Sequence, residues 1–191
     1  MSYLKTLVVS GAFTLLIIAA PASAQTIVGV AQSNDDFSSL VDAVVAQDLV
    51  DTLNGEGPFT VFAPTNDAFA NLPTYVSDVL ADEPELLTDI LLYHVVPGEL
   101  MAEDVLSERR LETALGTHLF VSARDGAKVN SANITATDIA ADNGVVHVID
   151  RVLIPQSVYQ AVIEDLREQL REVVRTLREV QQDRVADRTG R

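Results

Sequence analysis

The sequence contains no cysteine. The chain can therefore form no disulfide, no thiolate metal site and no cysteine nucleophile, and packing alone must hold its fold. Lysine and arginine are also scarce, with 13 residues against 28 aspartates and glutamates and a formal net charge of −15. This balance argues against nucleic-acid binding, which needs a basic surface, and against electrostatic docking to anionic lipid.

Motifs of catalysis are also missing. There is no Gly-x-Ser-x-Gly elbow of a serine hydrolase and no Gly-x-x-x-x-Gly-Lys phosphate loop. The three histidines, His94, His118 and His147, are far apart in the sequence, whereas zinc ligands come in closely spaced pairs. We therefore expect three structural histidines, no metal, no cofactor and no enzymatic activity. A hydrolase built on carboxylates is the weakest alternative, because an acidic chain brings carboxylates together by chance.

The first 24 residues have the pattern of a secretory signal peptide. Lys5 precedes an apolar run from Leu7 to Ala20, and Ala22-Ser23-Ala24 is a small-x-small motif, so we expect cleavage before Gln25. An uncleaved membrane anchor is the alternative, but the run is shorter than the roughly 20 residues of a spanning helix. The pattern predicts a protein that is periplasmic, secreted or at the cell surface, without a spanning segment after cleavage.

The stretch from Phe59 to Leu72 predicts a strand followed directly by a helix. Phe59, Val61 and Ala63 would lie on one face of the strand and Thr60 and Phe62 on the other, and most of these residues are aromatic or β-branched. Pro64 ends the strand because proline cannot donate to the ladder. Thr65 or Asn66 can then cap the free N–H groups of a helix. The polar residues of this corner therefore have structural roles.

Other helices are predicted on both sides of this corner. One begins at Asn34 and ends before a loop at residues 54–58, and a second runs over 75–80. A third begins at Pro84 and is largely buried through Leu86, Leu87, Ile90, Leu91 and Tyr93. The apolar stripe of the first predicted helix consists of Phe37, Leu40, Val41, Val44, Val45 and Leu49.

From Glu103 onward the pattern predicts short strands only. Turns are expected at residues 124–126 and 142–144. The apolar run from Val145 to Pro155 predicts a strand that is buried on both faces and bent near Asp150. The other candidate strands are Leu111–Leu115, a strand with Leu119 and Val121, and further strands with Val129, Ile134 and Ile139.

Three segments resemble the signature blocks of the fasciclin, or FAS1, domain. They are Thr60–Phe69, Leu92–Val96 and Gly144–Pro155, in the order of the family. The resemblance is to bacterial secreted members and leads us to assign residues 25–155 to this domain. It implies an α+β fold, a wedge-shaped β-sandwich with packed helices. It also implies an extracellular module that binds a protein, a cell surface or matrix and has no general enzymatic role.

The resemblance also names candidate adhesion residues. The Tyr-His motif of the family corresponds to Tyr93 and His94, with Val95, Val96 and Leu100 nearby. These residues also have the character of core residues, so both roles stay open. As a neutral imidazole, a buried His94 would need a hydrogen-bond partner, for which Asp67 is the candidate.

Residues 156–191 predict a long amphipathic helix with a frayed end. The tail carries seven acidic and seven basic residues, whereas Thr26–Pro155 carries 21 acidic and five basic ones. A capping box, Ser157-x-x-Gln160, begins the tail. Its apolar residues then recur at alternating steps of four and three, the heptad pattern of a coiled coil. This seam consists of Tyr159, Ile163, Leu166, Leu170, Val173, Leu177 and Val180.

Two arrangements would bury the seam. The helix can pack on its own domain, or it can pair with copies of itself, and the length of the seam favours a homo-oligomer. Val162 and Val174 widen the stripe, which fits a trimer or a docked helix. The sequence thus predicts an exported, non-enzymatic adhesion or binding module made multivalent by its tail. The alternative is a periplasmic carrier of an apolar small molecule or lipid, held between helices and sheet.

Overall fold

The computed structural model describes residues 25–124 and 126–189, with helix side chains up to Gln182. The predicted signal peptide, residues 1–24, lies outside this part of the chain, as does Asp125 in one predicted turn. Within the described residues, no helix is both long and apolar enough to cross a membrane.

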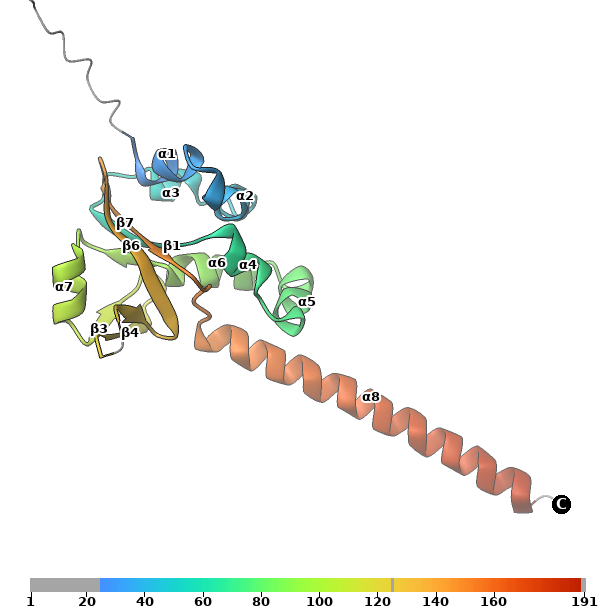
Figure 1. The fold of residues 1–191 in the computed structure, drawn as a ribbon. Coiled ribbons are helices and arrows are strands. Elements are labelled where there is room, and N and C mark those ends of the chain that lie inside the picture. Colours follow the sequence, from blue (N-terminus) through green and yellow to red (C-terminus); the bar gives the residue numbers. More distant parts are fainter. Residues whose placement is uncertain (1–24, 125, 190–191) are drawn as a thin grey trace, which may run out of the picture.

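Helices dominate the first half of the chain, and strands dominate the second half until the final helix (Figure 1). The first half contains α1 (Ile27–Gln32), a 3₁₀ turn (Asp35–Phe37), α2 (Ser38–Ala46), α3 (Val50–Leu53), β1 (Phe59–Pro64), α4 (Asn66–Ala70), α5 (Thr74–Asp82) and α6 (Glu85–Tyr93). The second half contains β2 (Val95–Pro97), α7 (Ala102–Ser107), β3 (Arg110–Glu112), β4 (His118–Ser122), β5 (Lys128–Val129), β6 (Ala132–Ala141), β7 (Gly144–Ile149) and α8 (Gln156–Thr189).

The strands form one curled sheet in the order β2-β1-β7-β6-β5-β4-β3. β1 and β7 are parallel, and the other neighbouring pairs are antiparallel. The two ends of this order approach each other, because the Ala114 N–H, just after β3, donates to the Val95 carbonyl of β2 at 2.7 Å. The predicted α+β class is thus confirmed.

Both faces of β1 are buried, as its residues predict. Val61 and Ala63 pack against α1, α2 and α3, while Phe62 points into the second core inside the curled sheet. β7 is likewise buried along its whole length, and the chain bends at Asp150 as predicted. The predicted strand up to Pro155 is too long, because β7 ends at Ile149. Gly144 at the start of β7 lies so close to the Phe59 carbonyl oxygen that any side chain would collide with it.

The predicted corner after β1 is confirmed. Thr65 is the N-cap of α4, and its hydroxyl accepts the Ala68 N–H at 3.4 Å. The neighbouring Asn66 has a different role, since its amide oxygen accepts the Ser39 N–H at 2.9 Å and joins α4 to α2. Phe69 and Leu72 pack with α5 and α8 in a third core.

Two predictions for the first helix need correction. Asn34 caps its start as expected, but the helix ends at Ala46 and a separate α3 follows. Asp48 at the break has a positive φ of 55°, which an α-helix does not accept. Val45, predicted in the buried stripe, is 54% exposed, because only one side of this short helix contacts the core.

The prediction of strands alone after Glu103 is wrong, because α7 covers Ala102–Ser107. Asp104 supports the helix by accepting the Met101 N–H at 3.2 Å, and Val105 is the residue that α7 buries. Ile134 and Ile139 share one strand, β6, instead of separate ones. Register shifts between them break the alternation that would have revealed a single strand.

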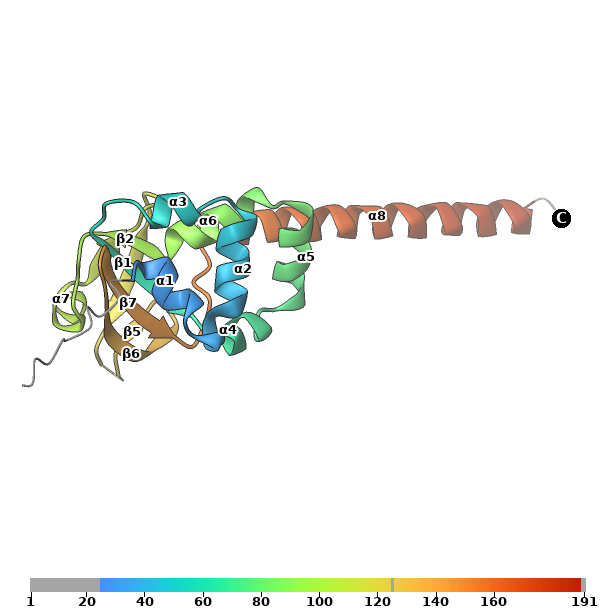
Figure 2. The ribbon, with the colours of Figure 1, turned by 90° about the horizontal axis from the view of Figure 1, so that it is seen from above.

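The tail forms one helix of 34 residues, α8, about 50 Å long at 1.5 Å per residue. It starts against the domain and then runs away from it into solvent (Figures 1 and 2).

Candidate functional site

Tyr93 lies in the core, 7% exposed, at the end of α6. Its hydroxyl donates to the His118 carbonyl at 3.0 Å and accepts from Asn130 Nδ2, also at 3.0 Å. The phenol therefore ties α6 to the start of β4 and to the turn between β5 and β6. Its ring surface is covered by the domain itself.

His94, the next residue, is also buried, with 2% exposed. Its Nδ1 donates to the Ile90 carbonyl at 2.7 Å, and its Nε2 accepts the Leu153 N–H at 2.9 Å. Both bonds require the neutral imidazole with its proton on Nδ1. Burial lowers the pKa of His94 from 6.5 to about 4, with a smaller opposing effect from the bond to Ile90. The side chain is thus a neutral clamp between α6 and the segment that leads to α8.

The expected partner of His94, Asp67, is not bonded to it, and the prediction of this pair is wrong. Asp67 is exposed in the first turn of α4, where its charge suits the helix dipole. The real partner, Leu153, lies 59 residues away in the sequence and contributes a backbone group. Nothing in the side-chain pattern marks such a partner.

The other members of the predicted adhesion set lead into a loop over residues 97–101. Val95 and Val96 are buried, 5% and 3% exposed, and Leu100 is half-buried. The hydroxyl of Thr60 holds the loop, because it donates to the Gly98 carbonyl at 2.7 Å and accepts the Leu100 N–H at 2.9 Å. Tyr93, His94, Val95 and Val96 are therefore buried, and the exposed part of this region is the loop.

A second buried histidine secures the same loop. His147 is fully buried, its Nε2 donates to the Leu100 carbonyl at 2.9 Å, and its Nδ1 accepts the Asp138 N–H at 3.3 Å. Asp138 lies at an irregular point of β6 with φ of 60°, and its carboxylate accepts the Ala102 N–H of α7 at 2.8 Å. His147 and the β6 irregularity together position the loop and the start of α7.

Among the described residues there is no candidate metal site, and no ligand-sized cavity lies between the sheet and α1, α2 and α3. No group of three or more His, Asp or Glu side chains there is arranged to hold a metal ion. The enclosed apolar space between the sheet and α1, α2 and α3 measures about 40 Å³. Pockets for small molecules measure about 300–1,000 Å³, so this space is too small for a lipid chain.

The base of α8 docks on its own domain, but not through the seam. Val158 and Val162 are 0% and 4% exposed and pack against Val76 and Val79 of α5 and Ile90 of α6. Ser157 adds a hydrogen bond to the Asp89 carboxylate of α6 at 2.8 Å. At about 100° per residue, this docked face lies roughly a quarter turn from the seam. The heptad pattern gives Val158 no role and places Val162 only at the edge of the apolar stripe, where it fits a docked helix.

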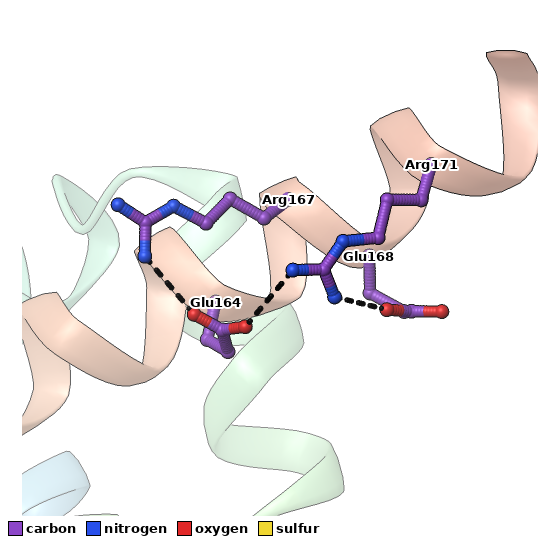
Figure 3. Close-up of polar contacts among 4 residues, drawn as sticks. All are labelled: Glu164, Arg167, Glu168 and Arg171. Atoms are coloured by element: carbon purple, nitrogen blue, oxygen red, sulfur yellow. Dashed lines mark hydrogen bonds and ion pairs between the residues drawn. The ribbon is translucent and has the colours of Figure 1, made fainter.

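The seam is left open to solvent along its whole length. Its seven residues are between 40% and 64% exposed, including Tyr159 and Ile163 beside the domain. On the side of α8 that faces away from the seam, Arg167 and Arg171 bind Glu164 and Glu168 in ion pairs of 3.1, 3.8 and 2.8 Å (Figure 3). Such pairs support an exposed helix but leave its apolar side uncovered.

Comparison with known proteins identifies the family. The family model of the fasciclin domain matches residues 35–155. Protein sll1483 of Synechocystis sp. is 52% identical over 140 residues, 72% of this chain and 77% of that protein. Immunogenic protein MPB70 of Mycobacterium bovis is 39% identical over 131 residues, 65% of this chain and 66% of that protein.

Longer relatives match over a small part of their length. Transforming growth factor-beta-induced protein ig-h3 of Oryctolagus cuniculus is 40% identical over 131 residues, 68% of this chain but 19% of that protein. The solved structure of a FAS1 domain pair from the insect cell adhesion molecule fasciclin I matches with a TM-score of 0.54 and 19% identity. That match covers 70% of this chain and 52% of the other and concerns the fold alone. The chain belongs to the fasciclin domain family.

Proposed function

We propose that this protein is an exported, non-enzymatic adhesion or binding module, made multivalent by association of α8 helices through the seam. The signal-peptide pattern of residues 1–24 supports export to the periplasm, the medium or the cell surface. Membership of the fasciclin family supports a binding role, since a solved FAS1 domain pair of the same fold comes from an insect cell adhesion molecule.

The observation that carries multivalency is the open seam. A single solvated helix gains nothing from seven apolar residues at heptad spacing, and each stays at least 40% exposed. Because Val158 and Val162 dock through another face, attachment to the domain leaves the seam free for partner helices. From Tyr159 to Val180 it extends about 30 Å, which accommodates three heptads.

The Tyr-His motif has an indirect role in this proposal. Tyr93, His94, Val95 and Val96 are buried, so they support the exposed loop 97–101 and do not themselves contact a partner. Leu100 joins that loop to the core. Adhesion effects of changes in the motif then arise from displacement of the loop.

Native mass spectrometry of the mature protein tests multivalency. We expect an oligomer for the wild type and a monomer for the double variant Leu170→Glu and Leu177→Glu, because charges in the seam oppose its burial. Gln182→Glu is the matched control, since Gln182 is exposed outside the seam and should leave the oligomer intact. A monomeric wild type across the micromolar range would refute the proposal.

Attachment to cells or matrix tests the binding role. The oligomer should be retained more strongly than the monomeric variant, by roughly 10²–10⁴-fold if several domains engage together. Tyr93→Phe keeps the buried ring but loses both hydroxyl bonds. We expect this variant to fold and to attach more weakly. Equal attachment of all three proteins would contradict both parts of the proposal.

A further inference from the structure

The outer side of α7, β3 and β4 forms an open groove of about 660 Å³. Its lining includes the end of α7, both strands of the β3–β4 hairpin and the residues that follow β4. α7 lies at the end of the domain opposite to the direction in which α8 leaves it (Figures 1 and 2). The groove is therefore on a side that the final helix does not cover.

The charge of this groove differs from that of the rest of the domain. Thr26–Pro155 has 21 acidic residues and only five basic ones, yet Arg109, Arg110 and Arg124 all line the groove. One carboxylate, Glu108, lines it with them. All three arginines are exposed. A domain that is otherwise strongly acidic thus has a locally basic surface here.

Arg109 and Arg110 form no ion pair with the described part of the domain. Every ion pair among the described residues lies on α8, so neither Arg109 nor Arg110 pairs with a described carboxylate within 4.0 Å. Phe120 lines the same groove as the three arginines. It is 61% exposed, more than any other large apolar residue of the domain. Phe120 is directly opposite Arg110 in the β3–β4 register. Leu106, 37% exposed, adds apolar surface at the end of α7.

We propose that this basic groove binds a short acidic segment of a partner protein. Carboxylates of the segment would bind Arg109, Arg110 and Arg124, since a guanidinium presents a planar pair of donors that matches a carboxylate. An apolar side chain of the segment would cover Phe120 and Leu106. Exposed aromatic residues beside arginine are the composition of protein–protein binding centres. The inference rests on the proposed binding function and names the chemistry of its partner.

The acidity of the remaining domain favours a short segment over a long polyanion. Exposed charges are screened beyond about 8 Å at physiological salt, so a segment confined to the groove experiences mainly the arginines. An acidic polysaccharide would continue past the groove onto a surface whose carboxylates repel it. A vesicle of anionic lipid would meet the same repulsion over a wider area.

Fluorescence anisotropy on the full chain tests the groove. The probe is a labelled peptide of alternating aspartate and glutamate with one phenylalanine and one leucine, compared with the same peptide in its Asn/Gln form. We expect saturable binding of the acidic form that weakens with salt, and no binding of the Asn/Gln form. The variant Arg109→Gln with Arg110→Gln should weaken binding about tenfold, as two exposed ion pairs allow, and Phe120→Ala should also weaken it.

The matched control is Arg151→Gln. Arg151 is an exposed arginine of the same domain that lines a separate groove beside α4, so its loss should leave peptide binding unchanged. All the substituted residues are exposed, and unchanged thermal unfolding would verify that each variant folds. The proposal is overturned if the acidic peptide does not bind, if the groove variants bind it like the wild type, or if an acidic oligosaccharide binds where the peptide does not.

The result is independent of the seam. The monomeric variant Leu170→Glu with Leu177→Glu should bind the peptide as well as the wild type does. A wild type that is monomeric but binds the peptide would refute multivalency and retain the groove. If amide hydrogen exchange at the groove slows with rising protein concentration in the absence of peptide, a second copy of the chain occupies the groove. That result would overturn the proposal.

Discussion

The domain and α8 differ in the exposure of their apolar side chains. In the domain, Phe62 and Ile149 are fully buried, and two histidines are buried with both ring nitrogens bonded. On α8, the large apolar residues from Ile163 to Val180 are exposed, and the ion pairs are local to the helix. The domain therefore buries its core side chains within one chain, whereas the helix has an exposed apolar surface that a partner can cover.

The sharpest form of this comparison uses two phenylalanines. Phe62→Ala should lower the free energy of unfolding by about 3–5 kcal/mol, because it leaves a cavity at a fully buried site. Phe120→Ala should change it by about 0.5 kcal/mol or less, since that ring is 61% exposed. Urea denaturation measures both. Similar losses in the two variants would mean that Phe120 belongs to the core.

Acid should weaken the domain through His94. Its pKa is about 4 in the fold and 6.5 when free, so between these values the unfolded chain binds more protons. The stability due to the neutral imidazole is complete above pH 6.5 and is lost as the pH falls toward 4. The loss between pH 6.5 and pH 5 should be about 2 kcal/mol.

Two histidine variants isolate this effect from the titration of the carboxylates. His94→Gln should be less stable at neutral pH but should lack the part of the pH dependence due to this imidazole. His118→Gln removes an exposed histidine of the same domain and serves as the matched control. Denaturation at a series of pH values gives the slopes. Equal slopes for the wild type and His94→Gln would contradict the neutral clamp.

Two valines of α8 separate docking from association. Val162→Ala should lower stability by about 1–2 kcal/mol at any protein concentration, because Val162 is 4% exposed against α5 and α6. Val173→Ala, at a site that is 54% exposed, should matter only where oligomers form. Thermal unfolding at low and high concentration measures both. A concentration-independent loss for Val173→Ala would count against the seam.

The smallest effect concerns the ion pairs on the side of α8 that faces away from the seam. Arg171 is within 2.8 Å of Glu168 and 3.8 Å of Glu164. Since these groups are exposed, Arg171→Gln should lower helix stability by about 0.5 kcal/mol or less. Circular dichroism of the helix should show that the difference disappears at high salt. A larger loss that persists in salt would mean that Arg171 packs in the oligomer.

The sequence predicted those features that depend on neighbouring residues. The strand–cap–helix corner at Thr65, the buried strand from Gly144 and the helix from Gln156 all follow local patterns. α7 was missed because six residues with one buried side chain, Val105, produce no periodic signal. Asn143 was recognised only as a turn residue.

Contacts between residues that are far apart in the sequence could not be predicted from local patterns. The buried amide of Asn143 accepts the Ile27 N–H at 2.9 Å and donates to the Leu53 carbonyl at 2.7 Å, and so connects the turn before β7 to the first helices. The bond of His94 to Leu153 and the basic groove are of the same kind. Each depends on the sheet order, which brings together residues that no local window contains.

The packed base of α8 has a consequence for how targets would be chosen. A domain on a flexible linker can reach binding sites at many separations. Here Val158 and Val162 pack α8 against the domain, so the domain and the helix move together. Chains that associate through the seam would then hold their binding surfaces at fixed distances from one another. Such an assembly would favour targets whose own spacing matches, and would ignore the same chemical groups arranged too closely or too far apart.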